Sequence, residues 1–189
     1  VAWPGVAPGT CDALTTSVDL FATLADLFGV TPRQRTHGRS LVPLLRGEAT
    51  RIRDWALAGY WGREVHLLDG RRKYARAPAG KNAPHAMLSN RWSTMPVHVP
   101  GFVPLPPPDH RAVLDHMPGS SIPVIRQPFV TGDLLPFWAL GHPMTGNHLW
   151  DLDEDPGEEH DLVGDRSEAD HADLLREALL GLEAPDDQL

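Results

Sequence analysis

Proline is the residue that most restricts how this chain can fold, because it recurs throughout residues 77–147. A proline fixes φ and lacks a backbone N–H, so regular helix and central strand are mostly excluded there. Within this segment, a short helix is possible at Asp109 to His116. The segment also carries more aromatic and aliphatic side chains than a solvated linker needs. We therefore expect a long, ordered insertion that packs, of the kind that forms lids or binding loops.

Residues 149–162 join an apolar strand to an acidic turn. Leu149, Trp150 and Leu152 predict a short strand that buries its aromatic side chain. Residues 153–159 then predict a tight turn, because Pro156 fixes φ and Gly157 permits a positive φ. The stretch is therefore interpreted as a strand followed by a structural turn.

A calcium loop is the alternative interpretation of this turn. Asp151, Asp153 and Asp155 have the alternate spacing of an EF-hand, which then requires glycine at its sixth position and glutamate at its twelfth. Those positions hold Pro156 and Leu162. The mismatch favours the structural turn.

The segments before the insertion predict one helix, a turn and a hairpin. Thr16 or Ser17 can cap a helix that ends at Gly29, with Asp19 as a helix-dipole partner. Residues 33–39 form a basic loop, which could face an anion or solvent, and residues 40–47 form a short apolar turn closed by glycine. Residues 55–76 predict a hairpin through Asp69-Gly70. The apolar face of the helix consists of Leu20, Leu24, Leu27 and Phe28.

Residues 167–182 predict a last helix, which should lie on the small sheet. Ser167 can cap it, and Glu168 and Asp170 place carboxylates in its first turn. Its apolar stripe consists of Leu174, Leu175, Ala178, Leu179 and Leu182.

Composition excludes several functional classes. The 189 residues carry a net charge of −8 and show no basic stripe, so nucleic acid is a poor candidate partner. The single cysteine, Cys11, excludes an internal disulfide framework and leaves no thiolate cluster for zinc. No run of residues is apolar and long enough to span a bilayer. The chain begins without methionine or a leader, so we expect a fragment whose compartment is undecided.

Several short segments of the chain form a recognisable set: Trp3-Pro4-Gly5, Gly9-Thr10, residues 17–29, residues 38–47, Lys73-Tyr74, residues 149–152, Asp155-Pro156 and Glu158. Together they resemble, in order and spacing, the late part of a sulfatase of the alkaline phosphatase superfamily. They account for roughly half of the chain. Ala22 and Asp161 depart from the family, which usually has proline at the first of these positions and often has asparagine at the second.

The resemblance implies an α/β enzyme of the alkaline-phosphatase-like sulfatase fold, of which this chain is the C-terminal portion. Residues 1–50 would end the large α/β domain, and residues 51–189 would form a small four-stranded antiparallel sheet packed by a C-terminal helix. The partner of this portion would be the upstream catalytic core.

The same resemblance places the chemistry outside the chain. The formylglycine precursor, a cysteine or serine in a Cys/Ser-x-Pro-x-Arg motif, and the calcium-binding carboxylates would lie upstream of Val1. Cys11 cannot be that precursor, because Asp12-Ala13-Leu14 follows it. No catalytic residue, metal ligand or cofactor is therefore expected within these 189 residues.

The remaining residues offer no other catalytic motif, since no nucleophile elbow, phosphate-cradling glycine loop or zinc-hydrolase motif is present. Ten histidines nevertheless invite a functional interpretation. We expect some of them to face a substrate cleft. The candidates are His66, His98, His142 and His148.

The expected function is hydrolysis of small-molecule or carbohydrate sulfate monoesters by the intact protein, with this portion as scaffold and cleft lid. Phosphate or phosphonate esters are the alternative substrates. A non-catalytic interaction module is the alternative class, because Pro104 to Pro108 could present a polyproline II ligand. If the chain exists alone, Leu20, Leu24 and Phe28 would be exposed, and we expect oligomerisation or partial disorder of residues 1–50.

Overall fold

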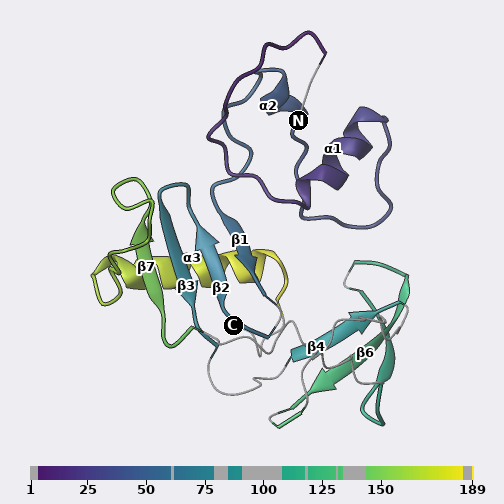
Figure 1. Ribbon diagram of the computed structural model, residues 1–189. Helices are drawn as coiled ribbons and strands as arrows, with labels where there is room; N and C mark the ends of the chain where they lie inside the picture. Colours follow the sequence, from purple (N-terminus) through teal and green to yellow (C-terminus); the bar gives the residue numbers. More distant parts are fainter. Residues whose placement is uncertain are drawn as a thin grey trace, which may run out of the picture. The chain divides into compact units, whose positions relative to one another are not determined.

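The structure is a computed structural model that describes residues 4–60, 62–78, 85–90, 108–117, 119–130, 132–133, 144–184 and 189. It shows a mixed α/β chain with two small antiparallel sheets and a C-terminal helix (Figure 1). This architecture is compatible with the expected fold class, whereas the division into a large and a small domain near residue 50 stays a prediction. No helix in the described part of the chain has the length and apolar character needed to cross a membrane.

The chain forms two compact units. One contains Val1–Ala58, His66–Tyr74 and His148–Ala178, and the other contains Gly59–Val65, Ala75–Asn147 and Leu179–Leu189. Residues distant in the sequence therefore meet within the first unit, which contains most of the segments that resemble a sulfatase.

The four-stranded sheet has the order β1-β2-β3-β7. The hairpin strands lie where the sequence predicts them, and β7 forms the predicted strand before the acidic turn. The strands are β1 (Ala56–Gly59), β2 (Val65–Leu68), β3 (Arg72–Arg76) and β7 (His148–Asp151).

The turn between β2 and β3 follows from its sequence. Asp69 N donates to Arg72 O over 3.2 Å, so Gly70 and Arg71 are the central residues of the turn. Gly70 has φ +99°, which favours glycine. Asp69 Oδ1 accepts hydrogen bonds from Arg71 N at 2.9 Å and Arg72 N at 2.6 Å, so the aspartate closes the turn with its own side chain.

Helix α3 (Ser167–Gly181) runs across one face of this sheet (Figure 1). The core residues Leu67, Tyr74 and Leu149 are fully buried, and Leu175 and Ala178 of the helix are buried as well. The capping prediction is wrong in detail: Ser167 lies inside the helix, and Asp165 Oδ1 accepts from Ser167 N over 3.2 Å. The Asp165 carboxylate, two residues upstream, thus supplies the side-chain acceptor at the start of α3 that was expected from the Ser167 hydroxyl.

Helix α1 (Asp19–Leu27) forms where expected, and a short helix, α2 (Val42–Leu45), forms where the sequence predicted an apolar turn closed by glycine. A glycine of positive φ follows each helix. Val18 stands at the N-cap of α1 without a side-chain cap, so the cap predicted at Thr16 or Ser17 is wrong. Asp19 Oδ2 instead accepts from Thr16 N at 2.7 Å. The predicted apolar face of α1 is exposed, as expected for the chain alone: Leu20 is 51%, Leu24 54% and Phe28 78% exposed.

The insertion contains a three-stranded antiparallel sheet of order β4-β6-β5. Its strands are β4 (His85–Ser89), β5 (Val113–His116) and β6 (Pro123–Phe129). The helix expected at residues 109–116 is therefore wrong, and so is the exclusion of a central strand. Pro128 is tolerated because β5 pairs only with residues 123–126, which leaves Pro128 with one neighbouring strand.

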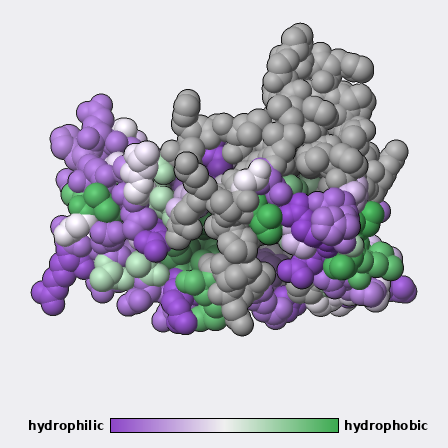
Figure 2. Space-filling view, turned by 90° about the horizontal axis from the view of Figure 1, so that it is seen from below, coloured by the Kyte–Doolittle hydropathy of each residue, from purple (hydrophilic) through white to green (hydrophobic). Residues whose placement is uncertain are grey.

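Polar contacts close the loops around this second sheet. Arg111 donates to Asp109 and, from Nη1 over 2.7 Å, to Asp133. The buried Gln127 of β6 donates to Asp109 Oδ1 over 3.0 Å. Hydrophobic side chains on the face drawn in Figure 2 form separate groups among hydrophilic ones. Pro104 to Pro107 lie outside the described residues, so the interaction-module hypothesis stays a prediction.

Candidate functional site

A set of side-chain contacts surrounds the acidic turn after β7. We call it the β7 cluster: Lys73, His148, Trp150, Glu158 and Asp161. Strand β3 supplies the lysine, β7 supplies the two rings, and the turn supplies the two carboxylates. All five residues lie within the first compact unit.

Lys73 fixes the turn to the sheet. Its Nζ donates to both carboxylate oxygens of Glu158, at 2.9 and 2.7 Å, and lies 5.1 Å from the centroid of the Trp150 ring. Trp150 is only 7% exposed, so the cation rests on a buried aromatic face. The residue of positive φ is Glu158, at +57°, and not Gly157 as predicted. The ion pair holds this glutamate in a conformation that favours glycine.

His148 is oriented from two sides. Its ring stacks on Trp150 with centroids 5.3 Å apart, and its Nδ1 lies 2.6 Å from Asp161 Oδ2. Asp161 Oδ1 also accepts from Leu149 N at 3.0 Å and Val163 N at 2.9 Å. Burial alone would raise the pKa of Asp161, but these hydrogen bonds and His148 together lower it below its ordinary value. The ionised carboxylate therefore fixes Nδ1 as the donor, and Nε2 is the nitrogen left for a ligand.

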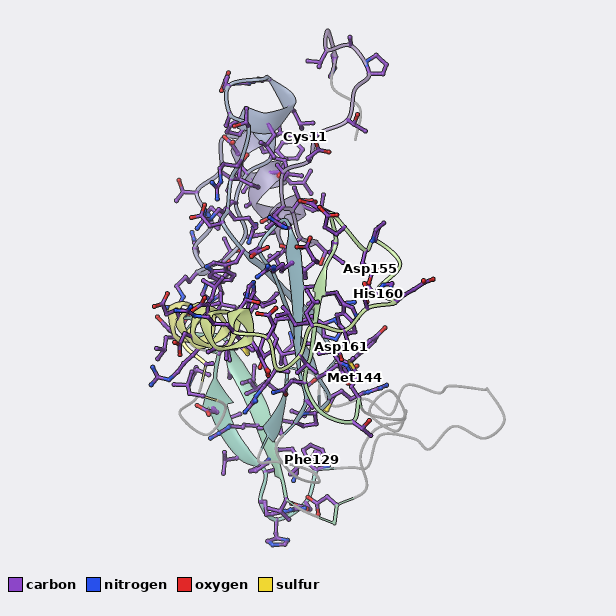
Figure 3. The ribbon with its side chains drawn as sticks, turned by 90° about the vertical axis from the view of Figure 1, so that its left-hand side faces the viewer. Cys11, Phe129, Met144, Asp155, His160 and Asp161 are labelled. Carbon is purple, nitrogen blue, oxygen red and sulfur yellow. The ribbon has the colours of Figure 1, made fainter. Side chains whose placement is uncertain are left out.

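Two of the three alternating aspartates, Asp151 and Asp155, accept hydrogen bonds from the protein itself. Asp151 accepts from Arg71 Nε at 2.9 Å, and this bond lowers the pKa of the Asp151 carboxyl group. Asp155 Oδ2 accepts from His160 N at 2.7 Å, which lowers the pKa of Asp155, and Figure 3 shows both residues on the turn. No three His, Cys, Asp or Glu side chains among the described residues are grouped so that they could hold a metal ion.

A second framework surrounds the start of α1. Asp19 is fully buried, and its Oδ1 accepts from Arg39 N at 2.8 Å and from the Arg53 guanidinium. Asp19 lies in the first turn of α1, as expected for a dipole partner, and it is also half of a buried ion pair. The sequence did not indicate Arg53 as the partner of Asp19, because the two residues are 34 positions apart. The arginines nearer to Asp19 in the sequence lie in the basic loop at residues 33–39. Arg39 of that loop donates to Ile52 O, so it has a structural role.

The segments that resemble a sulfatase bind one another in this framework. Thr23 Oγ1 donates to Asp19 O and accepts from Leu41 N at 2.9 Å. Ser40 Oγ donates to Asp26 Oδ2 at 2.5 Å. A Cβ on Gly38 would lie 2.2 Å from Val18 O, so only glycine allows this approach of the loop to α1. The described motif residues are therefore structural contacts between the segments.

Two of the four candidate histidines can be placed. His66 lies in β2 and His148 in β7, and both are half-buried. His66 precedes the fully buried Leu67, and His148 precedes the fully buried Leu149. Because successive side chains of a strand point to opposite faces of the sheet, each histidine lies on the face opposite to its neighbouring leucine. His98 and His142 lie outside the described residues, and their roles stay predictions.

No protein-family model matches the chain, and no curated protein matches it. One solved structure that is similar is a "sulf" protein, described with the versatile core genetic locus for metabolism of multiple glycosaminoglycans in Bacteroides thetaiotaomicron. The similarity has a TM-score of 0.39 and 16% sequence identity, covering 88% of this chain and 24% of that chain. The chain thus spans about a quarter of that structure's length.

Proposed function

We propose that this chain is the C-terminal part of a sulfatase-like hydrolase that cleaves sulfate monoesters. It would contribute scaffold and part of the lid over the substrate cleft. The nucleophile and the metal ligands would be supplied upstream of Val1, as a formylglycine residue and a calcium site in the catalytic core. No residue of the 189-residue chain would itself cleave the ester bond.

The observation that carries the proposal is the convergence of the matching segments. Residues 17–29, residues 38–47, Lys73 and the acidic turn are separate in the sequence, yet they bind one another in pairs. Asp26 binds Ser40, 14 residues away, and Lys73 binds Glu158, 85 residues away. Residues that resemble the family's motifs thus make contacts with one another within the unit, as expected if they are framework residues inherited with the family's fold.

The face of the sheet that carries His66 and His148 is the proposed contribution to the substrate cleft. Asp161 and Trp150 fix the His148 ring, so Nε2 is oriented without a loss of side-chain freedom when a ligand binds. An imidazole in this position suits the polar, oxygen-rich organic group of a carbohydrate ester.

The test is activity of the intact protein encoded by the complete reading frame. We expect hydrolysis of an aryl sulfate, with slower or no hydrolysis of the matching aryl phosphate and phosphonate ester. His148→Gln should raise KM for a carbohydrate sulfate, whereas His160→Gln should not, because His160 is exposed on the turn. A folded intact protein that retains the Cys/Ser-x-Pro-x-Arg motif and cleaves no sulfate ester would contradict the proposal. Faster hydrolysis of the phosphate or phosphonate ester would instead support the alternative substrates.

A further inference from the structure

A buried histidine ties helix α3 to the turn between β2 and β3. The His171 side chain is 9% exposed. Its Nδ1 lies 2.7 Å from Ser167 O on its own helix, and its Nε2 lies 3.2 Å from Asp69 Oδ2 on the turn. Neither the sequence interpretation nor the proposed function assigns a role to this residue.

Both neighbours of the ring can only accept hydrogen bonds. Ser167 O is a carbonyl oxygen. Burial alone would raise the pKa of Asp69, but hydrogen bonds from Arg72 N, Arg71 N and His171 lower it below its ordinary value, so the carboxyl group is ionised near neutral pH. Either neutral tautomer of the imidazole would therefore direct one nitrogen lone pair at an oxygen in a buried position. Turning the ring over would place carbon atoms at both oxygens and would lose both hydrogen bonds.

We propose that both ring nitrogens of His171 carry a proton in the folded chain, so that the His171–Asp69 contact is an ion pair and the docking of α3 on the turn depends on pH. The imidazolium donates from Nδ1 to Ser167 O and from Nε2 to Asp69 Oδ2. This role is independent of the proposed sulfatase function.

The other charged groups of the two elements have contacts of their own or are exposed. On the turn, Arg71 Nε and Arg72 Nε lie 2.9 and 3.6 Å from Asp151 Oδ2 of β7. On α3, Glu168 Oε2 accepts from Gly164 N at 2.8 Å, and the remaining charged residues of the helix are exposed. Asp69 is the carboxylate that contacts the ring.

The pH dependence follows from the proton balance. Imidazoles in unfolded chains lose their proton near pH 6.5. A folded chain that retains the proton at His171 binds one more proton than the unfolded chain above that pH, so its stability falls as pH rises. The unfolding equilibrium constant should therefore increase by about tenfold per pH unit until the folded imidazole also loses its proton.

The first test is a nitrogen-15 NMR titration of the whole chain from pH 5 to 9, with exposed His110 as the internal reference. We expect both His171 ring nitrogens to keep the shifts of protonated nitrogen to a higher pH than those of His110. Loss of one proton from His171 at the same pH as His110 or at a lower pH would overturn the proposal.

The second test is Asp69→Asn, which matches the geometry atom by atom. The amide oxygen can replace Oδ1, which accepts from Arg71 N and Arg72 N, and the amide nitrogen can replace Oδ2 and donate to Nε2. The neutral ring is then fully satisfied, so the fall in stability above pH 6.5 should disappear. The measurement is the free energy of unfolding by denaturant at several pH values, with His160→Gln as the control that should keep the wild-type pH slope. If Asp69→Asn also keeps the wild-type pH slope, the ion pair is contradicted.

Discussion

At the scale of single residues, the motif positions of this chain are explained by contacts rather than by chemistry on a substrate. Gly38 allows the backbone to pass Val18 O, Asp19 pairs with Arg53, and Lys73 pairs with Glu158. Each contact joins segments that are distant in the sequence. Substitutions at these positions should therefore change stability before they change any activity.

Gly38→Ala tests the closest of these approaches. The new Cβ would lie 2.2 Å from Val18 O and 2.9 Å from Val18 C, which are backbone atoms that cannot move independently. We expect a loss of about 2 kcal/mol or more in the free energy of unfolding, measured with denaturant. Gly9→Ala is the control, since no atom lies within 4 Å of its Cβ, and an equal effect of both substitutions would contradict the packing argument.

Lys73 and Glu158 are tested by a double-mutant cycle. Their side chains are 19% and 34% exposed, so solvent screens the pair only in part. Lys73→Met and Glu158→Gln should each destabilise the chain, with a coupling free energy of about 1 kcal/mol. The exposed pair of Arg51 and Asp54 is the control, for which coupling should be near zero. Additive effects of the Lys73 and Glu158 substitutions would show that the pair does not fix the turn.

At the scale of elements, the acidic turn should be sensitive to acid. The pKa values of Asp151, Asp155 and Asp161 are all lowered, so the folded turn favours the ionised carboxylates. The stability that they contribute is complete above about pH 5 and is lost as pH falls below about 4. We expect the amide shifts of Leu149 and His160 to report this loss together.

Two substitutions within the turn separate the carboxylates. Asp155→Asn should remove part of the acid dependence, because Asp155 accepts from His160 N. Asp153→Asn should leave it unchanged, since the Asp153 side chain is 67% exposed and its Oδ2 lies as far as 4.0 Å from Arg71 Nε. An acid titration that is the same in both variants would contradict the assigned hydrogen bonds.

Local signals in the sequence predicted most elements outside the insertion. Asp69-Gly70 located the hairpin, Gly29 located the end of α1, and the apolar spacing located α3. Gly47 located the end of an apolar turn, within which the structure forms the short helix α2. The sheet in the insertion was not predicted, because the sequence does not show which positions of a strand have a second neighbouring strand. Pro128 is tolerated because β6 has one neighbour there. The site partners Arg53 and His171 gave no local signal, since tertiary contacts alone bring them to Asp19 and Asp69.

At the scale of the whole molecule, α1 exposes an apolar face. Leu24 and Phe28 are 54% and 78% exposed, and such a surface costs about 25 cal/mol for each Å² that stays in water. We expect the isolated chain to self-associate as its concentration rises in analytical ultracentrifugation. Leu24→Ser with Phe28→Ser should shift it toward monomer, whereas Val163→Ser, at another exposed apolar position, should not. A wild-type chain that stays monodisperse and monomeric would contradict this prediction.

The most direct test of the proposed function is the coding sequence upstream of Val1. We predict an open reading frame that encodes Cys-x-Pro-x-Arg or Ser-x-Pro-x-Arg in frame, which would supply the formylglycine precursor to the scaffold described above. A start codon immediately before Val1 would contradict the proposal, because the chain would then lack the residues that the family's chemistry requires.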